Sequence, residues 1–300
     1  MFDRPGRFYR GNLHTHTTES DGSLSPQAVC QFYKDEGYDF LSITDHFLER
    51  FDYPLTDASP FDTPGFVTIR GAELHTDRMS AGELWHILAN GLPADFAPPP
   101  EGETGPQLAQ RAVEAGAFVS VANPAWYSLT QSDIEALGPD LHAIETVNIT
   151  SWDYNDRVES WHIYDVMLSL GHRYFCLATD DAHFHKGRFD FGLAWVWVKA
   201  ASLDPEALLA ALKAGDYYNS MGPRIHALEV RDEEVYVRCS PAERVMLTGH
   251  GSRAVYVNGR GIREATLSLE RFAESAYVRV IVRDHHGRRA WSNPIWVDTL

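Results

Sequence analysis

The chain has 300 residues, 44% of them hydrophobic and 12% aromatic, which suffices for one large domain or a large domain plus a small one. Its formal net charge of -16 argues against duplex nucleic acid or an anionic membrane as a partner. Three scattered cysteines predict no disulfide framework, and the polar N-terminus lacks the apolar core of a signal peptide. No apolar run reaches the length of a membrane span, so we expect a cytoplasmic protein. The sequence does not indicate its oligomeric state.

The first two thirds of the chain alternate apolar runs with helical segments. After an opening strand that leads to Gly11, strands are predicted at 40–43, 66–69, 84–89, 117–122, 141–147, 174–178 and 193–198. Helices are predicted at 26–36, 107–115, 132–137, 153–170 and 205–214, the third of them with a capping box of Ser132 and Glu135. This alternation through about residue 222 predicts a parallel α/β architecture.

The pattern changes at Pro223. From there to the C-terminus the chain consists of short alternating or β-branched runs separated by turns. We therefore predict two domains, an α/β domain at 1–222 and a small all-β, sandwich-like domain at 223–300.

His14 and His16 are two positions apart, so on a strand both imidazoles point to the same face. Asp21 follows after a turn-rich run, and two imidazoles with a carboxylate suit a divalent ion such as Zn, Mn or Fe. Other polar groups follow later strands in the same way: His46, Glu73, Asn123, Asp181 and His183. In a closed α/β barrel these strand ends converge on one place, where active sites are built.

Four ordered motifs carry a family resemblance: His-Thr-His-Thr-x-x-Ser-Asp-Gly from His14, Thr44-Asp45-His46, Gly71-x-Glu73 and Asp181-Ala-His183. Over roughly residues 8–223 the chain resembles the PHP family, named for polymerase and histidinol phosphatase domains. The run from Gly215 to Arg224, followed by the β-rich segment, is similar to a bacterial branch that includes carbaryl-hydrolase-like proteins.

The resemblance implies a distorted (β/α)7 TIM-like barrel that holds two or three divalent ions. It implies that His14, His16, Glu73 and Asp181 bind one ion, with Glu73 bridging, that Asp21, His46 and His183 bind a second, and that His86 shares a third with Glu73. The next family motif is His-Pro, but this chain has Asn123-Pro124. An amide oxygen is a weaker ligand than an imidazole, so we expect two tightly bound ions and a weak or missing third.

Some neighbours of these motifs have less certain roles. Glu145 matches a family acid expected near the metals, and His75, two positions past Glu73, is expected beside the ligands or on the surface. Asp180, adjacent to Asp181, is expected to make a structural hydrogen bond.

The expected activity is that of a metal-dependent phosphoesterase, which hydrolyses a small phosphate ester or nucleotide with a metal-activated water. Glu73, Asp181 and His183 are the candidate catalytic residues, and Lys186, Arg188, Arg224, Asn123 and Glu145 are candidates for binding substrate. Two alternatives remain open at this stage. One is a metal-dependent carbamate or carboxylic ester hydrolase, and the other is a non-catalytic module that metal ions stabilise.

Overall fold

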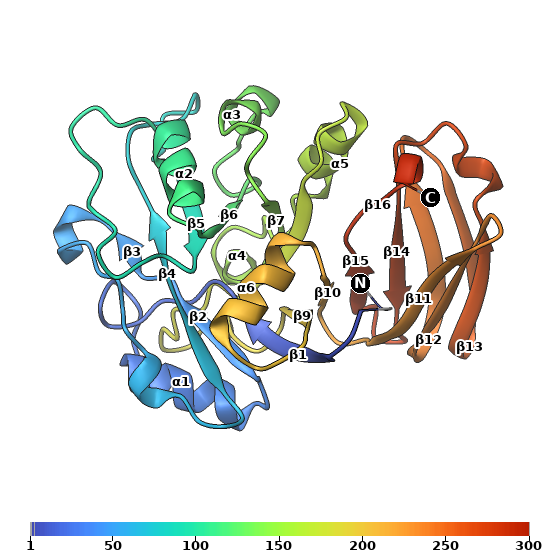
Figure 1. Ribbon diagram of the computed structural model, residues 1–300, viewed down its shortest axis with the longest axis horizontal. Coiled ribbons are helices and arrows are strands. Elements are labelled where there is room, and N and C mark those ends of the chain that lie inside the picture. Colours follow the sequence, from blue (N-terminus) through green and yellow to red (C-terminus); the bar gives the residue numbers. More distant parts are fainter. Residues whose placement is uncertain (1, 3, 300) are drawn as a thin grey trace.

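The computed structural model describes residue 2 and residues 4–299, and it has a mixed α/β fold (Figure 1). The strands before residue 223 are β1 (Arg7–Asn12), β2 (Phe40–Ile43), β3 (His46–Phe47), β4 (Val67–Leu74), β5 (Ile87–Asn90), β6 (Phe118–Val121), β7 (Ala143–Asn148), β8 (Phe175–Thr179), β9 (Trp195–Ala200) and β10 (Tyr217–Ser220). The helices are α1 (Pro26–Asp35), α2 (Gly105–Glu114), α3 (Gln131–Ala136), α4 (Thr150–Tyr154), α5 (Trp161–Ser169) and α6 (Pro205–Lys213). Within the described residues, no helix combines the length and the apolar character needed to cross a membrane.

All strands belong to one hydrogen-bonded network. Its order is β11-β12-β14-β15-β10-β9-β1-β2-β4-β5-β6-β7-β8, with β13, β16 and β3 paired to β12, β14 and β4 beside this path. The expectation of a parallel sheet is only partly met. β5 pairs antiparallel with β4, to which it is joined without the helical crossover that parallel neighbours need. β5 is also antiparallel to β6, although α2 lies between them in the chain. β9 is antiparallel to both β1 and β10.

Strands β8 and β10, which are not neighbours in the strand order, are joined by a buried side chain. Asn219 of β10 donates a hydrogen bond from Nδ2 to the carbonyl of Cys176 on β8, and its Oδ1 accepts one from the amide of Ala178. Asn219 is fully buried, so this contact holds β8 against β10 in the interior.

Two helix predictions need correction. The helix expected over 153–170 is two helices, α4 and α5, because Asp156 between them has a φ of 60°, which an α-helix cannot contain. The capping box of α3 is formed by Thr130 and Asp133 rather than by Ser132 and Glu135.

The C-terminal strands are β11 (Ile225–Arg231), β12 (Glu234–Gly249), β13 (Ala254–Ser268), β14 (Tyr277–Arg283), β15 (Arg289–Ser292) and β16 (Ile295–Trp296), and they gather on one side of the molecule (Figure 1). β15 pairs with β14 on one edge and with β10 on the other. Just beyond β15, Asn293 accepts a hydrogen bond from the Cys176 amide and donates to the carbonyls of Gly215 and Tyr217. The β-rich segment is therefore joined to the α/β part by backbone pairing and buried hydrogen bonds.

Candidate metal centre

The structure brings together all eight residues that the resemblance names as metal ligands: His14, His16, Asp21, His46, Glu73, His86, Asp181 and His183. His14 and His16 follow β1, His46 opens β3, Glu73 lies near the end of β4, and Asp181 and His183 follow β8. Parallel strands β1, β2 and β4 end at the same edge of the sheet, which explains why residues far apart in the chain meet here.

The first group of donor atoms surrounds one carboxylate oxygen. Asp181 Oδ1 lies 3.1 Å from His14 Nε2 and 2.9 Å from His16 Nε2, and each Nε2 lies 3.6 Å from Glu73 Oε2. Donors bound to one ion at about 2.0–2.2 Å with angles of about 90–110° are separated by about 2.8–3.6 Å. The three atoms from His14, His16 and Asp181 are buried and have no hydrogen-bond partner within the described chain. Buried polar atoms rarely go without a partner, so this set fits a divalent cation.

The second group lies beside the first and is more open. Asp21 Oδ1 is 3.4 Å from His46 Nε2, 3.5 Å from His183 Nε2 and 3.9 Å from His16 Nδ1. The Nδ1 of His183 faces the carbonyl of Asp181 at 2.8 Å, which places its proton there and leaves Nε2 free of a proton for an ion. The Asp21 side chain is 39% exposed, so this group is reached from solvent.

Carboxylates raise the pKa of two imidazoles in the centre, His14 and His46. Burial alone would lower the pKa of His14, but Asp181, Glu145 and Glu73 hold it well above its usual value. Burial also acts to lower the pKa of His46, yet Glu73 and Asp21 raise it to about 10. Without an ion, protons therefore neutralise the charge that divalent cations would otherwise neutralise.

Glu145 lies directly behind the first group and is 1% exposed. It accepts hydrogen bonds from His14 Nδ1 at 2.9 Å, the Asn123 amide at 2.8 Å and Asn148 Nδ2 at 2.9 Å, and a further one from the Thr179 hydroxyl. A carboxylate on Nδ1 fixes the proton there and directs the lone pair of Nε2 toward the ion. The sequence placed Glu145 near the metals but did not indicate this contact.

Sequence reasoning also missed Asp45. Its carboxylate accepts hydrogen bonds from the Thr17 amide at 2.7 Å and from the hydroxyls of Thr17, Ser20 and Thr56 at 2.7–2.8 Å. These contacts fix the turn that carries Asp21. The sequence signals were its place at a strand end and within the motif Thr44-Asp45-His46.

Asp180 makes the structural hydrogen bonds that the sequence predicted. Its oxygens accept from the amides of Gly192, Leu193 and Ala194 at 2.7–2.9 Å and from the Tyr33 hydroxyl at 2.9 Å. Burial raises its pKa to about 6 even though these donors oppose the shift. The adjacent Asp181 has a φ of 53°, and the anchored loop holds this uncommon conformation in place.

The candidate substrate cations lie in different parts of the fold. Arg224 lies over the ring of Trp197 at 4.5 Å, and Trp197 packs in the core of the C-terminal strands with Ile225 and Val237. The Arg188 guanidinium stacks at 3.4 Å on Tyr154 of α4, and its Nη1 is buried without a hydrogen-bond partner in the described part of the chain. The side chain of Lys186 is exposed.

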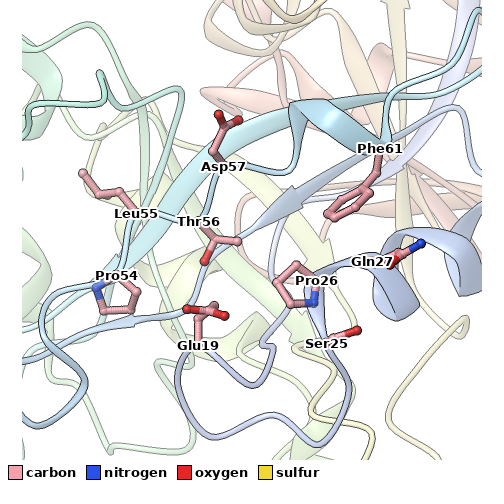
Figure 2. Close-up of a pocket in the computed structure, with 9 residues that line it drawn as sticks. All are labelled: Glu19, Ser25, Pro26, Gln27, Pro54, Leu55, Thr56, Asp57 and Phe61. Carbon is pink, nitrogen blue, oxygen red and sulfur yellow. The ribbon is translucent and has the colours of Figure 1, made fainter.

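A surface groove of about 530 Å³ lies next to the turn that carries Asp21 (Figure 2). Glu19 and Ser25 line one side, while Thr56 and Phe61 lie across from them. The groove is lined by acids and by no lysine or arginine, so it does not suit an anionic ligand.

No protein-family model matches the sequence, and no curated protein matches it either. Among solved structures, it is similar to a two-domain protein from Bacteroides vulgatus that contains a predicted PHP-like metal-dependent phosphoesterase, with 16% identity, a TM-score of 0.52, and coverage of 88% of this chain and 86% of that one. The two chains share a fold.

Two further solved structures are more distant. One is a candidate metal-dependent phosphoesterase from Bifidobacterium adolescentis (13% identity, TM-score 0.43, covering 59% of this chain and 88% of that one). The other is an amidohydrolase from Chromobacterium violaceum with bound sulfate and no metal (16% identity, TM-score 0.42, covering 58% of this chain and 87% of that one).

Proposed function

We propose that this protein is a metal-dependent phosphoesterase of the PHP family, with a distorted (β/α)7 barrel, that hydrolyses a small phosphate ester or nucleotide. The observation that supports this most is the convergence of the buried, unpartnered atoms of His14, His16 and Asp181 at separations suited to one ion. The fold shared with the Bacteroides vulgatus protein, which contains a predicted enzyme of this kind, supports it as well.

A bound divalent ion supplies Lewis acidity and a water whose pKa is lowered to about 7. The residues of the chain do the rest. Asp181 and the two imidazoles of the first group hold their donor atoms in place before substrate arrives, and Glu145 keeps the proton of His14 on Nδ1. Glu73 directs Oε2 to the first group and Oε1 to His86 at 2.8 Å, so its two oxygens would serve different ions.

His183 is a candidate ligand of the second ion rather than the acid for the leaving group, because its proton is on Nδ1 and its Nε2 carries the lone pair. Its Nδ1 is held on the Asp181 carbonyl, and its ring stacks on His16 at 4.2 Å, so its position is defined on both sides. Arg188 is the cation best placed to contact an anionic substrate, because its unpartnered Nη1 belongs to the same loop as His183. We do not include Arg224 in the site, because it lies over Trp197, which packs in the core of the C-terminal strands.

The test is a comparison of nitrophenyl phosphate, nitrophenyl acetate and a nitrophenyl carbamate with metal-stripped protein, before and after addition of Mn. We expect turnover of the phosphate only, restored by Mn and lost in Asp181→Asn, whereas Glu114→Gln on the exposed surface of α2 retains it. Hydrolysis of the carbamate or the acetate without the phosphate would favour the alternative ester hydrolase. Full metal loading without turnover of any of the three would favour a non-catalytic module.

A further inference from the structure

A third group of donor atoms lies on the other side of Glu73, and His75 belongs to it. His46, Glu73, His75 and His86 each offer one atom, all within 4.8 Å of one another. Glu73 Oε1 is 2.8 Å from His86 Nδ1, and Glu73 Oε2 is 3.7 Å from His75 Nε2. The rings of His75 and His86 are 4.3 Å apart and perpendicular, an arrangement that lets two imidazoles direct lone pairs at one point.

His75 is prepared as a ligand by its own surroundings. It is 2% exposed, and its Nδ1 lies 2.9 Å from the carbonyl of Trp85, an acceptor that requires the proton on Nδ1. Its Nε2 therefore carries a lone pair, and that atom faces Glu73 and His46 rather than solvent. A neutral imidazole with one nitrogen on a backbone carbonyl is the usual state of a metal-bound histidine.

Asn123, which stands where the family pattern has histidine, is engaged elsewhere. Its Nδ2 donates to Asp181 at 3.2 Å, and its backbone amide donates to Glu145. Asp181 is a member of the first group, and Glu145 supports that group from behind. The residue that the sequence pattern assigns to the third ion is thus held beside the first one.

The charge of the centre determines what a further cation would contribute. Glu73, Asp181, Asp21 and the supporting Glu145 carry four negative charges when ionised, which two divalent ions neutralise. A third ion leaves a net positive charge to meet an anionic substrate, in a protein whose own net charge is -16.

We propose that His75 replaces the missing family histidine, so that Glu73, His75 and His86 hold a third divalent ion in the native protein. The inference rests on the proposed metal-dependent function, but its test counts ions and needs no turnover. The competing role is that His75 only accepts the proton of His46 Nδ1, 2.8 Å away, and so orients a ligand of the second ion.

The experiment titrates metal-stripped protein with Zn at a buffered free concentration and counts bound ions by elemental analysis. The wild type and the control His285→Ala, which removes an exposed imidazole in a hairpin turn, should bind three ions. His75→Ala and His86→Ala should each bind two, because loss of a direct ligand exceeds the roughly 10–100-fold loss in affinity caused by changes to supporting residues.

Double variants identify which ion His75 holds. His75→Ala combined with His86→Ala should still bind two ions, since both changes remove the same one. His75→Ala combined with Asp21→Asn should bind one. Two ions in the wild type, three in His75→Ala, or one in the His75/His86 double variant would each overturn the proposal. Circular dichroism of the metal-free proteins checks folding, and His75→Gln takes the place of the alanine variant if that one unfolds.

Discussion

Replacing Glu145 with glutamine tests how the chain supports its first ion. In the native protein Oε1 accepts from His14 Nδ1 and the Thr179 hydroxyl, while Oε2 accepts from the Asn123 amide and Asn148 Nδ2. All four partners thus donate to Glu145 and need an acceptor oxygen, and a glutamine side chain supplies only one oxygen. Its amide nitrogen must face one of the two pairs of donors.

Each orientation has a distinct cost. If the nitrogen faces His14, the imidazole proton moves to Nε2 and the lone pair directed at the ion is lost. If it faces Asn123 and Asn148, two buried donors lose their acceptor, at about 1–3 kcal/mol each. We expect zinc affinity at the first group to fall by about 10–100-fold, equal to about 1.4–2.7 kcal/mol.

A competition titration against a chromophoric zinc chelator measures this change. Glu114→Gln removes the same charge from the exposed face of α2 and serves as the matched control. Thermal unfolding of both metal-free variants separates weaker binding from a damaged fold. Unchanged affinity for every ion in Glu145→Gln would show that His14 does not depend on this carboxylate.

Three other outcomes follow from the same contacts. Glu73→Gln should abolish most turnover and lower the ion count in elemental analysis, because a neutral amide cannot bridge two cations; normal turnover would exclude the bridging role. Asn293→Ala should lower the free energy of unfolding by about 2–5 kcal/mol in urea titrations, because the Cys176 amide and two carbonyls lose their buried partner. Burial acts to lower the pKa of His46, but Glu73 and Asp21 raise it to about 10. Metal binding at pH 7 should therefore release a proton from His46, and the metal affinity should increase as the pH rises toward 10. Calorimetry in buffers of different ionisation enthalpy measures that proton, and binding independent of both buffer and pH would refute the reasoning.

The residues at the ends of strands could be predicted because both their chemistry and their position are visible locally. His14 and His16 alternate on one extended segment, and Glu73 and Asp181 follow apolar runs. Their convergence needs only the rule that sites form where parallel strands end. The strand order that brings them together includes antiparallel strands, which the alternation of helices and strands did not indicate.

The supporting contacts could not be predicted, because they join residues far apart through the exact register of neighbouring strands. Glu145 meets His14 across 131 positions, next to an irregularity between Glu145 and Val147 in the pairing of β7 with β8. A one-residue change of register would turn Glu145 to the other face. The position of Arg224 could not be predicted either, since only the packing shows that it lies over Trp197 among the C-terminal strands.

The pairing of β15 with β10 determines where this protein can be divided. A cut after residue 222 separates β10 from β15 and removes Asn293 from the interior next to Cys176. It also removes Trp291, which is fully buried and packs at 5.2 Å against Trp161 of α5. The hairpin tip at Asp232 and Glu233, where both side chains are exposed, interrupts none of these contacts. Affinity tags, fluorescent reporters or circularly permuted termini therefore belong at that tip. If the C-terminal strands are exchanged between related chains, the residues of β10 that pair with β15 must be exchanged together with them.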